Sequence, residues 1–595
     1  MALEIIDKKI VGAINKLEDK LEGKLPIDRL ELLVLINSWG RTDFFYTQYL
    51  DEDIRIEKCE ATQSEQAFYQ NATSNPLLVK KLVRKECYDL SKLDVSQITD
   101  MDKLFMYSNF DGDISNWNTS NVTSMNAMFA FTNDFNSDIG NWNISNVTNM
   151  SEMFLYAKRF KSNIENWNVS NVVNMYGMFS YADKFNSPLN NWNTSNVTNI
   201  NKIFYNAKEF NQDINNWNIE KITEAYSVFF KAKKFNQPLD KWNVSNISIM
   251  RNLFYEALNF NQDINSWDVS NVKDMGNMFY GTLNFNQPLN KWNTNKVTNM
   301  SNMFCNAKNF NQEISMWDVS NVTNMGYMFY KTKEFNQPLN NWNTNNLKNI
   351  VDMFAYAEKF NQPLNSWNIS KIFNLDRVFN GTKSFNQNLN DWDTSNITSM
   401  IRTFANTYDF NGDISQWNTS KVKNMTSMFQ NAYAFNQNIS SWDVSNVEFM
   451  DSMFSYADNF NQPIGNWNID SLTDISYMFE CTKKFNQDLS NWNFTNILDM
   501  YKTFSEAKAF NQNITNWDFT NIRECDYIFK NADAFEKKYN NGESLPVDTD
   551  YLIRWINENR EKMKLINIKD QHGEEIDNFF SIIEKESKKI QNKEI

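Results

Sequence analysis

A tryptophan recurs every 25 residues from Trp117 to Trp517, seventeen times without a slip. Such a fixed period is the signature of repeat architectures, in which each unit is one coil that contacts only its neighbours. A chain of 595 residues is long enough for several globular domains. The regular tryptophans instead predict a stack of near-identical coils around a long, thin core.

The unit itself indicates which side chains form this core. With Trp at position 0, it reads W-[ND]-[VTI]-S-N-V-T-N-M-x-x-M-F-x-x-A-x-x-F-N-Q-x-[IL]-x-N. Positions 12 and 18 are Phe in all seventeen units and hold 34 of the 47 phenylalanines. Position 5 is always aliphatic, position 22 is Ile or Leu in every coil from Ile114 to Ile514, and position 8 carries a methionine column that we interpret as core filler beside Phe. The clearest members of that column are Met125, Met150, Met175, Met275, Met300 and Met325.

Two periodicities alternate within the unit. The spacing of Ile139, Trp142, Ile144 and Val147 predicts a short extended segment around each Trp. The steps of 3, 3, 1 and 3 residues from Val147 through Met150, Met153 and Phe154 to Ala157 are typical of one face of a helix. We therefore expect a short strand plus a short helix in each coil, with coils stacked at about 4.8 Å.

Four segments follow from where the repeat begins and ends. We predict an N-terminal helical region at 1–75, a capping helix within 76–92, the solenoid at 93–535, and a C-terminal helical cap and tail at 536–595. The individual helices are expected at about Leu3–Glu22, Ile27–Trp39, Pro76–Arg84, Tyr551–Lys564 and Glu575–Lys589.

The residue inventory argues against catalysis and against cofactors. His572 is the single histidine and lies near the C-terminus, so the array has no Ser/His/Asp or Cys/His arrangement and no histidine-based metal site. No glycine-rich phosphate loop is present. The five cysteines are irregularly spaced without a CxxC pair, and we interpret them as small structural side chains. We expect no enzymatic activity, no cofactor and no bound metal.

Net charge and hydropathy bear on partners and compartment. The formal net charge of −14 and the pI of about 4.9 argue against nucleic acid and anionic membranes as partners. No run of apolar residues approaches a membrane helix, and no signal peptide opens the sequence. We expect a cytoplasmic location by default, unless a leaderless route exports the protein.

Two asparagine columns, at positions 19 and 1, permit two interpretations. Amides repeated at strand spacing can form ladders in which each one bonds to the next coil. The alternative is a polar strip that binds a partner.

From Leu90 onward, the segments LSKLDVSQITDMDKLF, FDGDISNWNTSNVTSMNAMF and FNQDINSWDVSNVKDMGNMF resemble the BspA-type leucine-rich-repeat family. The resemblance covers roughly Pro76–Phe535. It implies an α/β solenoid, a right-handed leucine-rich-repeat-like array of about 18 coils with helical caps. It also implies a bacterial surface protein that serves adhesion or protein binding and carries no catalytic residues.

We expect a non-enzymatic interaction scaffold that binds a protein partner on the strand face, through the exposed neighbours of each Trp at positions 24 and 1. The candidate partner-binding residues are Asn118, Asn143, Asn168, Asp268, Asp318, Asp393 and Asp443. One alternative is a glycan-binding adhesin, which would need tryptophans accessible to sugars. Another is that residues 1–75 carry an activity that the coils present. The oligomeric state is left open.

Overall fold

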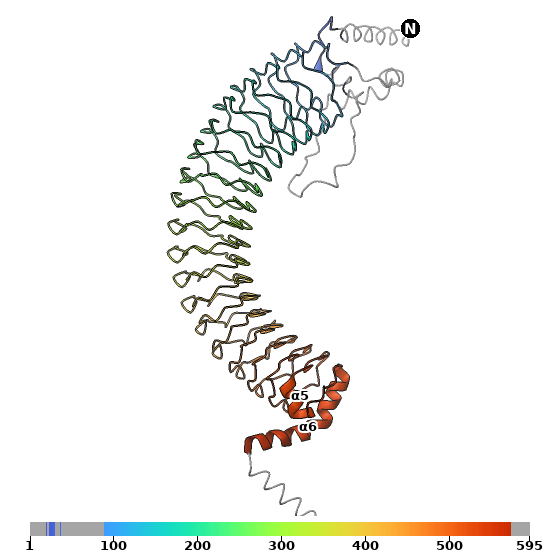
Figure 1. Ribbon diagram of the computed structural model, residues 1–595, viewed down its shortest axis with the longest axis vertical. Helices are drawn as coiled ribbons and strands as arrows, with labels where there is room; N and C mark the ends of the chain where they lie inside the picture. The colour runs from blue at the N-terminus through green and yellow to red at the C-terminus, as the bar shows by residue number, and fades with distance from the viewer. Residues whose placement is uncertain (1–19, 21–22, 30–31, 33–35, 37–88, 573–595) are drawn as a thin grey trace, which may run out of the picture. The chain divides into compact units, whose positions relative to one another are not determined.

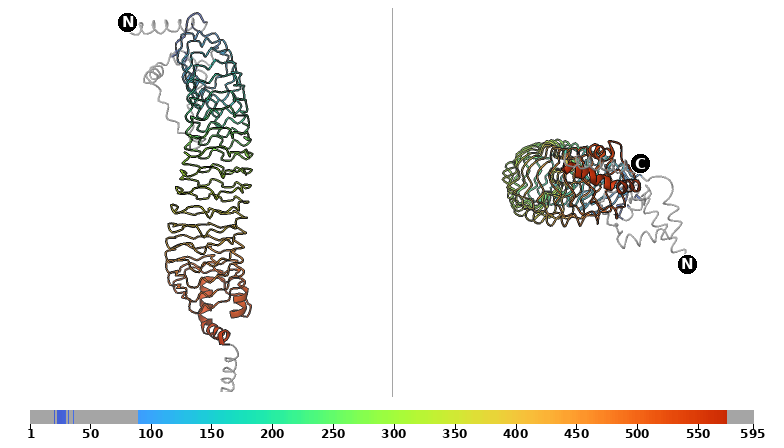
Figure 2. Two further views of the ribbon diagram at one scale, coloured as in Figure 1. Left: turned by 90° about the vertical axis from the view of Figure 1, so that its left-hand side faces the viewer. Right: turned by 90° about the horizontal axis from the view of Figure 1, so that it is seen from below.

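The computed structural model describes residues 20, 23–29, 32, 36 and 89–572. The chain divides into two compact units, Met1–Lys296 and Val297–Ile595, each of which is described by itself. Within each unit, every 25-residue repeat forms one flat coil that lies on the next (Figure 1), and the edge-on view shows the coils as parallel loops (Figure 2). The fold is a solenoid-like repeat, as the tryptophan spacing predicts.

Along one edge of each coil, backbone hydrogen bonds join it to its neighbours. In the coil that starts at Trp142, the N–H groups of Met150, Glu152, Phe154 and Tyr156 donate to carbonyls of the following coil at 2.9, 2.7, 2.9 and 2.8 Å. These are positions 8, 10, 12 and 14 of the repeat. Because each of these N–H groups is satisfied by the next coil, the stack is held by a ladder of parallel-type bonds.

The helix expected in each coil is wrong. Over Ser151–Tyr156 the chain forms linked turns, in which the N–H of Met153 donates to Met150 and that of Ala157 to Phe154, three residues back. Positions 10 and 14 have positive φ, +57° at Glu152 and +58° at Tyr156, and all seventeen repeats share this feature. A positive φ interrupts the right-handed helix and is required at the third residue of a type II turn.

The prediction of a strand around each Trp is also wrong, both in the position of the strand and in its length. Parallel pairing in the described part of the chain is limited to isolated bridges, and within the array these lie at position 7, as between Ser124, Asn149 and Asn174. Near Trp142 the backbone turns instead. The N–H of Trp142 donates to Ile139 at 3.2 Å and that of Val147 to Ile144 at 2.9 Å, so neither is free to pair with another coil.

Aromatic side chains stack along the core of each unit. Phe129 and Phe154, both at position 12, have ring centroids 5.7 Å apart and planes 3° apart. Within one coil, Phe154 and Phe160 stack at 3.9 Å. These rings are fully buried, as are all six methionines singled out above. The assignment of positions 8, 12 and 18 to the core is therefore confirmed.

The indole N–H groups also bond to carbonyls 28 residues earlier in the chain. The Nε1–H of Trp142 donates to the carbonyl of Ile114 at 3.0 Å, and the same bond recurs at Trp167 and Trp392. Trp517 is the exception, because its buried Nε1 has no hydrogen-bond partner. Its ring packs at 4.4 Å against Phe494, which replaces the smaller residue usual at position 2.

The asparagine ladder is confirmed at position 19. The side-chain oxygen of Asn361 accepts the backbone N–H of Asn386 at 3.0 Å and the Nε2–H of Gln387 at 2.8 Å, both in the next coil. At position 1 the side-chain oxygen closes a turn within its own coil, and the amide bonds to the preceding coil at some repeats, as Asn368 Nδ2 does to Asn345 at 2.8 Å and Asn493 Nδ2 to Asp470 at 2.7 Å. A second ladder that the sequence analysis did not identify lies at position 4, where Asn146 Nδ2 donates to the Ser120 carbonyl at 2.7 Å.

Both ends of the described array carry additional structure. Pro26 pairs with Asp94 of the first, degenerate coil, and Ile27, Leu32 and Ile36 are buried. At the other end lie α5 (Asp533–Asn540) and α6 (Thr549–His572), the second of which confirms the helix expected over Tyr551–Lys564. The predicted helices Leu3–Glu22, Pro76–Arg84 and Glu575–Lys589, and most of Ile27–Trp39, lie outside the described residues.

Candidate interaction face

Five positions beside the hydrogen-bond ladder change residue type from coil to coil. These are positions 7, 9, 10, 13 and 14, which we call the ladder face. In the coil of Trp367 they are Asn374, Asp376, Arg377, Asn380 and Gly381. The core columns and the asparagines at positions 4 and 19 are largely constant, because they fill the core or bond to a neighbouring coil. The ladder face is one of the variable parts of the repeat, and in the first unit some of its side chains, such as Phe131, Tyr156 and Tyr181, are buried in one cluster.

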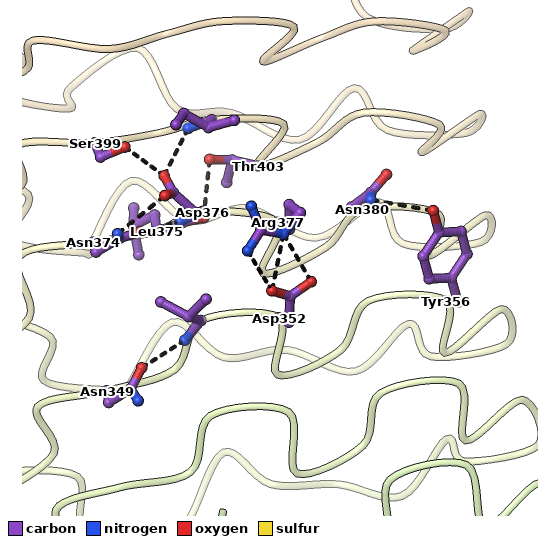
Figure 3. A network of polar contacts seen from close by, with 12 residues as sticks. Asn349, Asp352, Tyr356, Asn374, Leu375, Asp376, Arg377, Asn380, Ser399 and Thr403 are labelled. Atoms are coloured by element: carbon purple, nitrogen blue, oxygen red, sulfur yellow. Dashed lines mark hydrogen bonds and ion pairs between the residues drawn. The ribbon is translucent and has the colours of Figure 1, made fainter. Parts of the chain in front are cut away.

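An ion pair joins two coils on this face (Figure 3). Arg377 Nε lies 3.1 and 2.9 Å from the two carboxylate oxygens of Asp352, and its NH2 lies 2.8 Å from one of them. The Asp352 side chain is 3% exposed and that of Arg377 34%. Burial and the nearby Asp352 raise the pKa of Tyr327, so its hydroxyl stays protonated at neutral pH.

A second network surrounds Asp376 on the same face (Figure 3). Its Oδ1 accepts the Ser399 hydroxyl at 2.5 Å and the backbone N–H of Ile401 at 2.9 Å, while Oδ2 accepts Asn374 Nδ2 at 3.0 Å. Polar side chains of the ladder face are therefore fixed by contacts between coils, which limits the entropy lost when they contact a partner.

Large apolar side chains are also exposed along the ladder face of the second unit. Tyr327, Tyr356 and Tyr456 are 36%, 37% and 41% exposed, and Phe449 is 51% exposed. Aromatic residues and arginine are the residue types that contribute most at protein interfaces.

The candidate residues at position 1 lie at equivalent places in their coils and are all exposed. Each one, however, accepts the backbone N–H of the residue two positions later: Ser120 bonds to Asn118 at 3.2 Å and Ser395 bonds to Asp393 at 3.1 Å. The same turn occurs at Asn143, Asn168, Asp268, Asp318 and Asp443. One oxygen of each side chain therefore has a structural role.

The serine at position 3 also changes the pKa of the aspartates among these residues. Hydrogen bonds from the Ser270, Ser395 and Ser445 side chains lower the pKa of Asp268, Asp393 and Asp443, respectively. A serine hydroxyl that bonds the carboxylate stabilises its charged form. These aspartates keep their negative charge at neutral pH.

The tryptophans and cysteines lie where the sequence predicts. The seventeen tryptophans are 1–4% exposed, so they offer no aromatic platform to a sugar. Cys305 and Cys525 are buried and Cys481 is half-buried. Burial raises the pKa of Cys525 to about 12, consistent with an unreactive structural side chain. Cys59 and Cys87 lie outside the described residues.

In the part of the chain that the structure describes, no three His, Cys, Asp or Glu side chains gather in an arrangement that would hold a metal ion. None of the helices there combines the length and the apolar content needed to cross a bilayer.

The ladder face was missed because the sequence analysis placed the strand around each Trp. One signal was available in the sequence. Positions 9, 10, 13 and 14 vary across the seventeen repeats, whereas the neighbours of Trp are nearly always Asn, Asp or Ser. Constant polar residues indicate a structural turn, and variable ones indicate a surface whose composition the fold does not dictate.

A family model described as "Mycoplasma protein of unknown function, DUF285" matches the chain six times. The matches cover residues 66–192, 137–239, 184–292, 281–389, 362–458 and 438–542, which together are more than half of the chain. No curated protein matches.

Two solved structures are similar. A leucine-rich repeat protein from Eubacterium ventriosum is 13% identical with a TM-score of 0.22, over 67% of this chain and 82% of that one. The Toll–Spatzle complex of Drosophila is 8% identical with a TM-score of 0.19, over 64% of this chain and 54% of that one. The match thus spans about half of the latter's length.

Proposed function

The chain belongs to the family described as Mycoplasma protein of unknown function, DUF285, whose repeat is the BspA-type leucine-rich repeat, and from this premise we propose that it is a non-enzymatic scaffold for a protein partner. The partner contacts the ladder face. The finer architecture proposed with it is a right-handed array of about 18 coils.

One observation supports the ladder face above the strip at position 1. Its side chains differ between coils whose core residues are nearly identical, as Tyr327, Asp352 and Arg377 do at position 10 of three successive repeats. A face that changes along the stack offers a partner many distinct contacts in a fixed order. The strip at position 1 repeats the same Asn or Asp and offers little to distinguish one coil from another.

The proposed function is protein recognition. The family resemblance suggests adhesion or host interaction as its biological context. The glycan alternative needs accessible indoles, which the buried tryptophans do not provide. An activity in residues 1–75 concerns a segment that is mostly outside the described residues.

The test compares two surfaces with matched triple variants. Asn277→Glu, Tyr327→Glu and Arg402→Glu alter position 10 of the ladder face, and Asp268→Lys, Asp318→Lys and Asp393→Lys alter position 1. Cross-linking mass spectrometry of the full chain in its native cells identifies the partner, and titration calorimetry measures its affinity for each variant. We expect at least a tenfold loss, about 1.4 kcal/mol, for the ladder-face variant only. A loss of affinity in the position 1 variant only would show that the partner binds the neighbours of Trp instead.

A further inference from the structure

Three carboxylates occupy the same ladder-face position in the last three repeats. Asp474 pairs with Asp499 through a parallel bridge, and Asp499 pairs with Glu524. Side chains at bridged positions of neighbouring coils stand about 4.8 Å apart. Burial and the carboxylates of Asp499, Asp526 and Asp474 raise the pKa of Glu524, because like charges disfavour its ionised form.

The local turn does not need these charges. Asp474 accepts the N–H of Ser476 at 2.7 Å, and Asp499 accepts that of Tyr501 at 3.0 Å. In the first unit Asn149 makes the same contact with Ser151 at 3.1 Å. An amide oxygen therefore closes this turn equally well, and the negative charge at 474 and 499 is an addition to the structural role.

Three tyrosines flank these carboxylates at positions 9 and 10. Tyr477 and Tyr501 meet edge to face with centroids 5.2 Å apart and planes at 65°, and Tyr501 meets Tyr527 at 6.0 Å and 79°. All three rings are partly exposed.

The tyrosines already hold one cation of the chain itself. The Nζ of Lys502 lies 5.6 Å from the Tyr477 centroid and 5.4 Å from the Tyr501 centroid, and it lies 3.8 Å from Glu480. Lys530 Nζ lies 5.3 Å over Tyr527. The electron-rich ring faces and the adjacent carboxylates thus form a surface to which an ammonium group binds favourably.

The charge of this surface is one-sided. On the ladder face of the three coils, Lys502 and Lys530 are opposed by six carboxylates, of which Glu506 also pairs with Lys508 at 2.9 Å and Asp526 accepts the backbone N–H of Thr549 at 2.8 Å. The six carboxylates are Asp474, Glu480, Asp499, Glu506, Glu524 and Asp526. The carboxylates follow one another along the stack, and the described residues include no group of three that would hold a metal ion. An extended segment with several cationic side chains matches such a row better than a single ion does.

We propose that the face formed by Asp474, Asp499, Glu524, Tyr477, Tyr501 and Tyr527 binds a lysine- or arginine-rich segment of a protein partner. The proposal rests on the scaffold function and specifies the chemistry of the partner. The cationic groups pair with the carboxylate row, and their stems and charged ends pack on the tyrosine rings.

The test uses a fluorescein-labelled decalysine peptide and the full chain, with affinity read from fluorescence anisotropy in 50 mM and 500 mM salt. The variant Asp474→Asn, Asp499→Asn, Glu524→Gln keeps the turn acceptors and removes three charges. The matched control Asp268→Asn, Asp318→Asn, Asp393→Asn removes three charges from an equivalent turn at position 1. We expect a loss of at least tenfold in the first and less than threefold in the second. Equal losses of affinity in the two variants would show that the peptide binds only through the net charge of the protein, and would overturn the proposal.

The tyrosines are tested separately. Tyr501→Leu should weaken decalysine binding severalfold, and Tyr501→Phe should not, because the ring face survives in phenylalanine. Lys502→Met should strengthen binding, since it vacates the two rings that this lysine covers. Equal binding by the leucine and wild-type proteins would exclude the aromatic contribution and overturn the proposed face. These peptide results do not depend on the identity of the cellular partner. The scaffold function is tested separately, by the affinity of that partner for the ladder-face variant.

Discussion

At the scale of the single residue, the indole N–H shows how one atom fixes the register of a coil. Trp492 is 4% exposed, and its Nε1–H donates to the carbonyl of Ile464, 28 residues earlier, at 3.1 Å. Trp517, one coil later, is buried without an acceptor for the same atom. Two neighbouring tryptophans thus have the same ring and the same burial but differ in one hydrogen bond.

That difference gives a matched pair of substitutions. Trp492→Phe loses a buried hydrogen bond, whereas Trp517→Phe removes a donor that is already unsatisfied. We expect the first variant to lose about 1 kcal/mol more unfolding free energy than the second. Urea denaturation followed by circular dichroism measures both. Equal losses would mean that ring packing alone determines the value of the indole.

Glu152 illustrates a charged group that the fold disfavours. Burial raises the pKa of Glu152, and Lys103 and Lys202 offset this only in part. A carboxyl whose pKa is higher in the folded state binds its proton more tightly there, so its contribution to stability falls as pH rises through the unfolded value near 4.3.

We therefore expect Glu152→Gln to be more stable than the wild type at pH 7, with the difference shrinking as the pH falls towards 4. Thermal denaturation of both proteins across this range checks the sign. A wild type that is the more stable protein at pH 7 would show that the two lysines outweigh burial.

At the scale of the element, positive φ at positions 10 and 14 decides what each coil becomes. All thirty-four of these positions in the seventeen repeats lie in the left-handed region, and three of them are glycine. None is Val, Ile or Thr. Because β-branched side chains strongly disfavour positive φ, their absence is the sequence trace of the turn structure that replaces the expected helix.

Ser452 provides a test, since it has a φ of +57° and is half-buried. We expect Ser452→Val to destabilise the protein by about 1–2 kcal/mol. Ser452→Gly, which tolerates this conformation, should change stability by less than about 1 kcal/mol. Both values come from urea denaturation. A helix at this place would reverse the order, because glycine is the poorer helix former.

At the scale of the whole molecule, the contacts between coils repeat at nearly the same sequence separation. Backbone bonds, asparagine ladders and ring stacks between coils join residues about one repeat apart, as Phe404 and Phe429 do at 5.7 Å. Ion pairs such as Lys359–Glu334 add to this register on the surface. Stability in such an array is close to a sum over coils and the interfaces between neighbours.

Deleting one complete repeat should therefore be tolerated. Removal of 417–441 joins Gln416 to Trp442 and restores the sequence pattern, so we expect a folded protein with a modestly lower thermal midpoint. Removal of 417–428 places Phe429 out of line with Phe404 and should abolish cooperative unfolding of the second unit. Circular dichroism and limited proteolysis distinguish the two. Similar behaviour of both deletions would show that the coils do not depend on register.

The sequence by itself determined the repeat and the buried columns, and it offered the asparagine ladder at position 19 as one of two interpretations. These follow from residue type at a fixed period, because a position held as Phe in every repeat has no other consistent place than the core. It also located α6, whose residues lie beyond the last tryptophan repeat.

Only the tertiary structure decided between helix and linked turns. The spacing from Val147 to Ala157 is satisfied by both, since each buries the same side chains. The choice depends on whether the N–H of Glu152 bonds within its coil or to Tyr176 in the next, at 2.7 Å. The position of the ladder face follows from that same choice. A bond between coils has no signature in the spacing of one repeat, so the interaction face became visible only once the coils were stacked.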